Sequence, residues 1–280
     1  MMLIPFRLKP IAFAGLIVSF VTLTLAGPSR AASPNISTAE PPLIRAEGDT
    51  VFYTGLIGPD SGGAFLASVE SAAGLRRLVI NSGGGDTIAA RIIGRWVAEH
   101  QLDVEVVGGC FSSCANYIFV AGRNKVINKN AFVGWHGSEF QYDAVAVSTP
   151  QKTAAELLEE EVREAMAAAI ADGEMPDEAD VAEQVARLLA SRAEEAEFFR
   201  DIGIDIELTV YGHHPKNLPV IEASGKDGWT YSVADMARFG VTDVLYLGPG
   251  RYQDSTSVQK YLVVLPVHAD CCKIPEKSRK

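Results

Sequence analysis

The chain has 280 residues, which suits one large domain or two small ones. Hydrophobic residues make up 48% of it, so the composition excludes a disordered protein. The formal net charge of −10 argues against nucleic acid as a partner, because phosphate binding requires a basic surface. The four cysteines are too few for a scaffold held together by disulfides.

The N-terminus has the pattern of a secretory signal peptide. Arg7 and Lys9 precede an apolar stretch over Ile11–Ala26, and small residues follow up to Ala31. We therefore expect residues 1–31 to be removed and the mature protein to be periplasmic or secreted. The rival interpretation is an uncleaved membrane anchor, although the apolar stretch is shorter than the roughly 20 residues that span a bilayer. We expect no other contact with the membrane.

The remaining chain is predicted to contain a flexible leader over residues 32–49, a folded domain over residues 50–250 and a polar tail over residues 251–280. Short apolar runs and segments with helical spacing alternate along the domain. The expected elements are a strand at Val51–Tyr53, a helix at Ala64–Ala73, a strand at Leu78–Asn81, a helix at Ile88–Val97, a strand at Val104–Val107, a helix at Cys114–Ala121 and a strand at Ala131–Trp135. This alternation predicts an α/β fold with a parallel sheet.

A helical insertion is predicted at about residues 152–200. The segment Ala154–Phe199 is rich in Ala, Glu and Arg, and only Gly173 and Pro176 interrupt it. We expect two helices joined by a turn, with their charges on a solvated face. The alternatives are an insertion used in assembly and a lid. After it, Trp229–Leu247 returns to a helix followed by a strand.

The most informative segment for chemistry is Gly108–Asn116, with the sequence GGCFSSCAN. Its glycines allow a sharp turn from a strand into a helix. A serine at that turn lies at a helix N-terminus, where backbone N–H groups stabilise an oxyanion. A serine at this place is also a common helix N-cap, so the segment alone does not establish catalysis.

Two further segments carry potentially reactive groups. His136 lies at the end of a strand between glycines and is a candidate general base or a structural histidine. His213 and His214 are expected in a loop, with metal binding as the alternative. The chain lacks the His/Glu spacing of metalloproteases, so we predict no metal and no cofactor.

A third segment is the glycine-rich turn from Asn81 to Asp86, which follows a buried strand. It lacks the spacing of a phosphate-binding loop or a dinucleotide fingerprint. Three consecutive glycines allow the backbone to approach a ligand closely and suit one half of an oxyanion hole. The alternative is a plain turn between a strand and a helix.

Together, these segments resemble the proteolytic subunits of Clp proteases, within the Clp/crotonase fold group. The similar stretches are Leu78–Ala90, Gly109–Gly122, Val133–His136 and Trp229–Asp243, and they occur in the family's order. The resemblance implies a repeated β-β-α superhelix with a parallel sheet and an added helical insertion. It also implies a serine endopeptidase that acts on peptides or unfolded proteins. The signal peptide and the paired cysteines suggest an exported relative, and members of the family form oligomers.

The resemblance also implies roles for individual residues. Counting back from Ala121–Gly122, the nucleophile falls on Ser113, and counting from Cys110 favours Ser112 instead. We prefer Ser113 because the end of the helix is the firmer reference point. The general base is then His136.

Two further parts of the site follow from the same resemblance. The catalytic acid is expected at Asp227, one residue from the family's position. The oxyanion donors are expected to be the backbone N–H groups of Gly85 and Cys114. Gly83 replaces the family's usual proline and loosens this turn.

The cysteines leave several alternatives open. Cys110 and Cys114 lie on either side of the two serines, so a disulfide between them would clamp the turn. Cys271 or Cys272 could pair with either of them instead, or all four could be reduced thiols. The sequence does not select a pairing.

Three functions compete at this point. The first is an exported serine peptidase using a Ser-His-Asp mechanism. The second is a catalytically inactive binding or scaffold protein of the cell envelope that has the same fold. The third is an acyl-CoA enzyme of the crotonase type, which would require neither Ser113 nor His136.

Overall fold

The computed structural model describes residues 41–149, 151–169, 176–268 and 271–272. The predicted signal peptide lies outside these residues. The strands are β1 (Leu43–Glu47), β2 (Thr50–Thr54), β3 (Arg77–Ser82), β4 (Asp103–Phe111), β5 (Lys125–Ile127), β6 (Phe132–Gly134), β7 (Trp229–Thr230), β8 (Val244–Tyr246) and β9 (Val263–Val264). The helices are α1 (Ser61–Val69), α2 (Thr87–Glu99), η1 (Cys114–Phe119), α3 (Gln141–Ser148), α4 (Ala154–Ala169), α5 (Glu178–Ile202), η3 (Ile206–Thr209), η4 (Tyr211–His213), α6 (Leu218–Ser224), α7 (Val233–Arg238), η5 (Tyr252–Asp254) and α8 (Thr256–Tyr261).

The centre of the protein is a seven-stranded sheet with the order β1-β2-β3-β4-β5-β8, and β6 pairs with β4 beyond the end of β5. Every pairing in it is parallel except that of β1 with β2. Parallel neighbours require crossover connections, which α1, α2 and η1 supply. The predicted α/β class with a mostly parallel sheet is confirmed.

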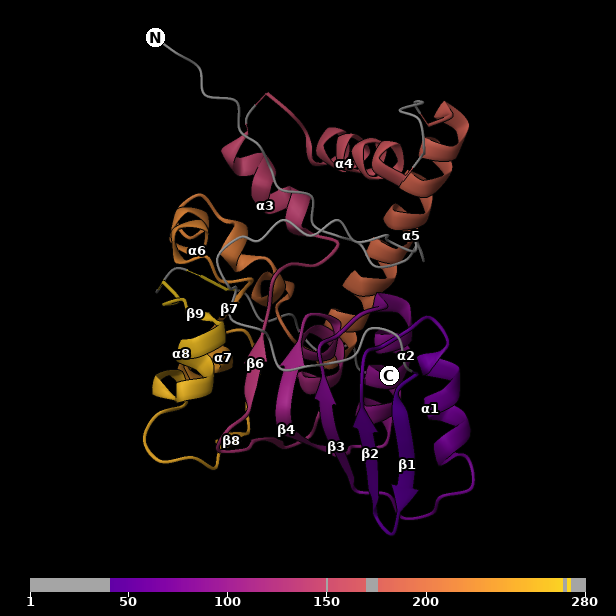
Figure 1. The fold of residues 1–280 in the computed structure, drawn as a ribbon, viewed down its shortest axis with the longest axis vertical. Helices are drawn as coiled ribbons and strands as arrows, with labels where there is room; N and C mark the ends of the chain where they lie inside the picture. Colours follow the sequence, from indigo (N-terminus) through magenta and orange to yellow (C-terminus); the bar gives the residue numbers. More distant parts are fainter. Residues whose placement is uncertain (1–40, 150, 170–175, 269–270, 273–280) are drawn as a thin grey trace, which may run out of the picture.

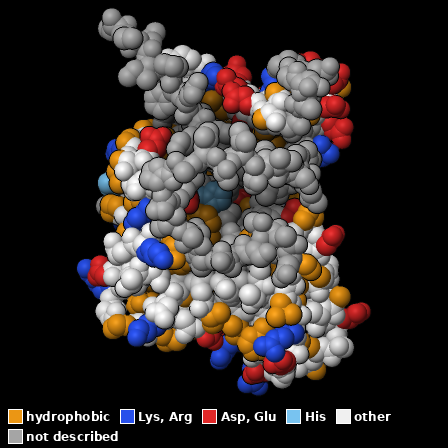
Figure 2. Space-filling model, viewed as in Figure 1, with side chains coloured by type: hydrophobic (Ala, Val, Ile, Leu, Met, Phe, Trp, Pro, Cys, Tyr) orange, Lys and Arg blue, Asp and Glu red, His pale blue; other side chains and the backbone are white. Residues whose placement is uncertain are grey.

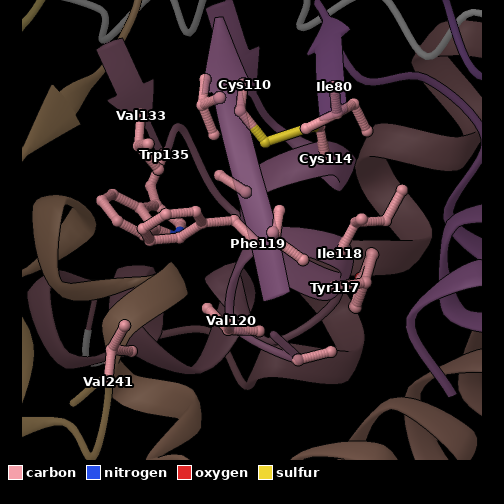
Figure 3. Close-up of a cluster of buried hydrophobic side chains, with 14 of the residues drawn as sticks. Ile80, Cys110, Cys114, Tyr117, Ile118, Phe119, Val120, Val133, Trp135 and Val241 are labelled. Carbon is pink, nitrogen blue, oxygen red and sulfur yellow. A yellow bond between two sulfur atoms is a disulfide. The ribbon is translucent and has the colours of Figure 1, made fainter. Parts of the chain in front are cut away.

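The hydrophobic core joins the sheet to the helices α1, α2 and η1, and it also includes buried side chains of α5, α7 and α8. Alternate residues of the central strands are fully buried, among them Val51, Leu78, Ile80 and Val104. Figure 3 shows how Ile80 and Trp135 enclose this part of the core together with side chains of η1. Because both the strands and the helix bury these side chains, the turns that join them are held in fixed positions.

The folded domain begins earlier than predicted. Leu43–Glu47 was expected in the leader, but it forms strand β1 and pairs with β2 in an antiparallel hairpin. Gly48, at a φ of +62°, makes the turn between the two strands. The strand lies at the edge of the sheet and alternates between exposed and half-buried residues, so it has no continuous apolar run in the sequence.

The domain also extends further towards the C-terminus than predicted. Residues 251–265 were expected in a polar tail, but they contain α8 and β9, and β9 pairs with β7 in a second, two-stranded sheet. The buried hydroxyl of Tyr252 donates to Val133 O at 3.0 Å and accepts from Val133 N–H at 2.8 Å. This segment therefore contributes to the core through Tyr252, Val258 and Leu262, whereas Arg251, Asp254 and Lys260 are exposed.

The predicted insertion is helical, with α4 and α5 on either side of Pro176. It also includes α3, which begins at Gln141, immediately after the loop that follows β6. We refer to α3, α4 and α5 as the helical insertion. Tyr142, Leu158 and Val181 are buried in a small core of its own. Figure 1 shows that the parallel strands point towards the end of the molecule where the insertion lies.

Candidate active site

The two serines predicted as alternative nucleophiles lie in the turn between β4 and η1. We call residues 110–114 the nucleophile turn. Ser112 has a φ of +59°, a conformation that is uncommon for residues other than glycine. Its N–H donates to Gly134 O at 3.0 Å, and its carbonyl accepts the Asn116 N–H at 2.8 Å. These two bonds hold Ser112 between β6 and the first turn of η1.

The structure places the predicted base, His136, beside Ser112 and not beside Ser113. Ser112 Oγ lies 2.6 Å from His136 Nε2, and the Ser112 side chain is partly exposed. The Ser113 side chain is buried, and its hydroxyl donates to Gly85 O at 2.6 Å. The preference for Ser113 is therefore not supported by this geometry, and the alternative, Ser112, has the contact that a nucleophile needs.

The helix η1, which follows the two serines, differs in its winding from an α-helix. Its residues form a π-helix, in which each hydrogen bond spans five residues instead of four. The segment therefore contains more residues per turn than an α-helix.

His136 follows β6 and is held on several sides. Its carbonyl accepts a hydrogen bond from His213 Nε2 at 3.0 Å, and its ring stacks on Phe111 with a centroid distance of 5.0 Å. Burial lowers the pKa of His136 below its usual value of 6.5, and the negative charge of Asp227 partly opposes this shift. The imidazole is therefore neutral at pH 7, which is the form that can accept a proton.

Asp227 lies in the loop between α6 and β7, with an exposed side chain. Its charge raises the pKa of His136, so the structure brings these two predicted residues into electrostatic range of each other. The third predicted residue therefore belongs to the same region as the Ser112–His136 pair.

The glycine turn, residues 82–86, lies directly against the nucleophile turn. Gly84 and Gly85 have φ values of +87° and +139°, which glycine adopts readily. Gly84 O accepts the Ile57 N–H at 2.8 Å, and the Asp86 N–H donates to Ile57 O at 2.7 Å. A Cβ at Gly84 would lie 2.9 Å from Ser113 N, so only glycine allows the two turns to come this close.

This arrangement changes one of the two predicted oxyanion donors. When Ser112 is paired with His136, the amide that follows the hydroxyl-bearing residue belongs to Ser113 and not to Cys114. The Cys114 side chain is fully buried. The hydrogen bonds between the glycine turn and Ile57 are made by Gly84 O and the Asp86 N–H. Neither of them uses the Gly85 amide, which is the predicted oxyanion donor of this turn.

The cysteines form two disulfides, Cys110–Cys114 and Cys271–Cys272. The first one bridges the nucleophile turn, as one of the sequence alternatives anticipated, and Figure 3 shows it within the core. The adjacent pair Cys271–Cys272 was not foreseen, because each of these cysteines was considered only as a partner for Cys110 or Cys114.

Two other residues near the site make contacts that the sequence did not indicate. Asn116 Nδ2 donates to Gly137 O at 2.9 Å, so η1 and the residues after His136 are directly connected. His213 lies in a short helical turn at η4, and burial lowers its pKa to about 4. A histidine in a Gly/Pro-rich stretch gave no indication of this contact with the carbonyl of His136.

Two buried carboxyl groups were also missed. Glu139 accepts hydrogen bonds from Thr87 Oγ1 at 3.0 Å and from Ser191 Oγ at 2.6 Å. Glu195, on α5, is fully buried and was expected on a solvated helix face. In the sequence it is indistinguishable from the exposed glutamates around it.

The described residues contain no group of three or more His, Cys, Asp or Glu side chains that could hold a metal ion. None of their helices has the length and apolar character needed to cross a bilayer.

A cavity of about 630 Å³ lies between α1 and α2, lined among others by Leu66, Trp96 and His100. It contains none of the predicted site residues. In Figure 2 a histidine side chain is visible near the middle of the face shown.

Comparison with known proteins adds no independent identification. No protein-family model matches the chain, and no curated protein sequence matches it significantly. The candidate site is therefore defined by its own geometry and by the four motifs of the sequence.

Proposed function

We propose that this protein is an exported serine peptidase in which Ser112 is the nucleophile and His136 the general base. The observation that carries the proposal is the 2.6 Å separation of Ser112 Oγ and His136 Nε2, with a neutral imidazole and a partly exposed hydroxyl. A serine hydroxyl is a weak nucleophile until an adjacent base accepts its proton.

In the proposed acylation step, His136 Nε2 accepts the Ser112 hydroxyl proton while Oγ forms a bond to the peptide carbonyl carbon. The carbonyl π electrons move to oxygen, and the amides of Ser113 and the glycine turn stabilise the oxyanion. The C–N bond then breaks, and the leaving amine takes the proton from Nε2. Asp227 stabilises the imidazolium that forms in between.

Hydrolysis of the acyl-enzyme repeats these steps with water. His136 accepts a proton from the water molecule, whose oxygen attacks the ester carbon. The ester bond to Ser112 breaks, and the proton returns to Ser112 Oγ. The substrate class, peptides or unfolded proteins, comes from the resemblance to Clp proteolytic subunits, as do the superhelical fold and the homo-oligomer that we propose with it.

Export is part of the same proposal. The Cys110–Cys114 disulfide supports it, because disulfides persist in oxidising compartments and are rare in the cytoplasm. Determination of the mature N-terminus of the expressed protein tests it, and an N-terminus near Ala32 is the expected result. An intact Met1 in the purified protein would contradict cleavage.

The activity is tested with a fluorophosphonate probe, which phosphonylates an activated serine and releases fluoride. We expect the wild type to be labelled and Ser112→Ala to be unlabelled. The competing proposal is an inactive scaffold of the same fold, and the replacement of the family's proline by Gly83 favours it. A correctly folded wild type without any labelling would support the scaffold and overturn the peptidase.

A further inference from the structure

The loop that carries the proposed base is fixed through its backbone. We call residues 136–139 the base loop. Three of its backbone groups are bonded to side chains from different elements: His136 O to His213, Gly137 O to Asn116, and the Glu139 N–H to Glu195 Oε2 at 3.2 Å. The position of the imidazole thus depends on groups outside the loop.

Of these three groups, only Glu195 comes from the helical insertion. Its other oxygen, Oε1, accepts a hydrogen bond from Tyr117 Oη at 2.9 Å, so one carboxyl group connects α5 to η1 and to the base loop. Tyr117 lies in the helix that begins immediately after Ser113. Glu195 is therefore connected both to η1, the helix that follows Ser112 and Ser113, and to the base loop that carries His136.

Glu195 lies beside a cluster of hydrogen-bonded polar side chains formed by Arg91, Glu139 and Ser191. Arg91 on α2 donates to Glu139 Oε1 at 3.3 Å and to Ser191 Oγ at 2.6 Å. Both side chains of the Arg91–Glu139 pair are about 95% buried. Ser191 lies one helical turn before Glu195, so α5 is attached to the base loop at two successive positions.

A buried carboxyl group is costly to retain. Removing a carboxyl group from water is unfavourable unless hydrogen bonds compensate, and an apolar side chain could fill the same volume at lower cost. Glu195 has compensating hydrogen bonds, among them one from the Glu139 N–H of the base loop and one from Tyr117 Oη in η1. The arrangement is thus suited to positioning as well as to holding α5 in place.

We infer that Glu195 is a positioning residue: through the Glu139 amide and Tyr117, it makes the helical insertion set the placement of His136 relative to Ser112. This inference rests on the proposed function. It implies that the helical insertion contributes to the reactivity of Ser112. A change in α5 should then alter the rate of proton transfer from Ser112 to His136.

The test compares Glu195→Ala and Glu195→Gln in the full mature chain. The side chain of Gln retains an oxygen for the Glu139 N–H and an amide group that can donate to Tyr117 Oη. We expect Glu195→Ala to lower the limiting rate of fluorophosphonate labelling about 10²-fold, the cost of a small misplacement of reacting groups. We expect Glu195→Gln to label at close to the wild-type rate.

Two control variants separate positioning from stability. Val181→Ala removes a buried side chain from the same helix without touching the base loop, and Glu183→Ala removes an exposed carboxylate from it. We expect Val181→Ala and Glu195→Ala both to lower the unfolding temperature, but only Glu195→Ala to lower the labelling rate. Glu183→Ala should change neither.

An NMR titration of the histidine imidazoles supplies a readout that does not need activity. The pKa of His136 should change in Glu195→Ala and stay at the wild-type value in Val181→Ala. A labelled wild type, with a folded Glu195→Ala that reacts at the same rate and keeps the same His136 pKa, would overturn the inference and leave the peptidase intact. An unlabelled wild type would instead overturn the proposed function, and the titration would still report on Glu195.

Discussion

Gly84 lies against Ser112 so closely that a Cβ built on the glycine would fall 2.7 Å from the Cβ of the serine and 2.4 Å from Phe111 O. Real Cβ atoms essentially never make contacts this short, so a side chain at Gly84 must push the two turns apart. The glycine-rich turn thus has a steric function that does not depend on which amide binds an oxyanion.

This contact gives the first prediction. Gly84→Ala should reduce fluorophosphonate labelling of Ser112 by at least about 10²-fold, because the displaced turns separate the reacting groups. Gly48→Ala is the matched control, since Gly48 also has a positive φ, of +62°, but has no atom within 4 Å of its Cβ position. If both variants react at the wild-type rate, the close approach of the turns is unimportant for reactivity.

The second prediction separates the two serines. Ser112→Ala should abolish labelling with little effect on stability, because the Ser112 side chain is partly exposed. Ser113→Ala should remain labelled and lose about 1 kcal/mol of unfolding free energy, because it removes the buried hydrogen bond to Gly85 O. Mass spectrometry of the labelled peptide and denaturant unfolding measure the two effects. Labelling at Ser113 would restore the assignment counted from the helix end.

The third prediction concerns the pH dependence of the reaction. The pKa of His136 is lowered below 6.5 by burial, so the imidazole stays neutral to a lower pH than an exposed histidine. The midpoint of the fall in labelling rate should therefore lie below pH 6.5, where His136 becomes protonated. A midpoint above 6.5 would contradict this environment for the base.

The fourth prediction concerns stability at alkaline pH. Burial, with the nearby charge of Glu139, raises the pKa of Glu195 from 4.5 to about 8 in the folded state. Between these two values the folded protein binds more protons than the unfolded chain, so stability falls as the pH rises. The hydrogen bond from Tyr117 and the charge of Arg91 act in the opposite direction.

Thermal unfolding at pH 6 and pH 9 measures this effect. The unfolding temperature of the wild type should fall by several degrees more than that of Glu195→Gln, since about 1 kcal/mol corresponds to roughly 2–4 °C in a domain of this size. Equal losses in the two proteins would show that Glu195 does not titrate in this range.

The fifth prediction concerns the disulfide across the nucleophile turn. Cys110 and Cys114 are four residues apart, and closing so short a loop contributes about 2 kcal/mol to stability in the chain-entropy description. The double variant Cys110→Ala/Cys114→Ala should lose about this free energy of unfolding and also label more slowly, because the unusual φ of Ser112 is less constrained. Cys271→Ser/Cys272→Ser is the control and should label like the wild type.

The sequence predicted the central part of the fold well, for a physical reason. Strands such as Leu78–Asn81 are buried on a parallel sheet and appear as continuous apolar runs that end at glycine-rich turns. By contrast, β1 lies at the edge of the sheet with one face in water, and β9 pairs through only two residues. Such strands are defined by their partners more than by their own composition.

The sequence predicted which segments of the chain form the candidate site. His136 and the two serine alternatives were identified from glycine-flanked positions at the ends of strands. The sequence did not decide between Ser112 and Ser113, because the contact with His136 depends on the local backbone of the turn, where Ser112 has a φ of +59°. The role of Glu195 was hidden for a different reason, since the pattern of charges on α5 does not show which glutamate points inward.

The pairing of β9 with β7 has a consequence for the order in which the protein matures. Val263 pairs with Trp229, and Trp229 exchanges backbone hydrogen bonds with Trp135, the residue that immediately precedes His136. A nascent chain that has not yet been synthesised past Val264 lacks the outermost of these supports. We therefore expect the proposed Ser112–His136 pair to gain its full support only after β9 has paired with β7.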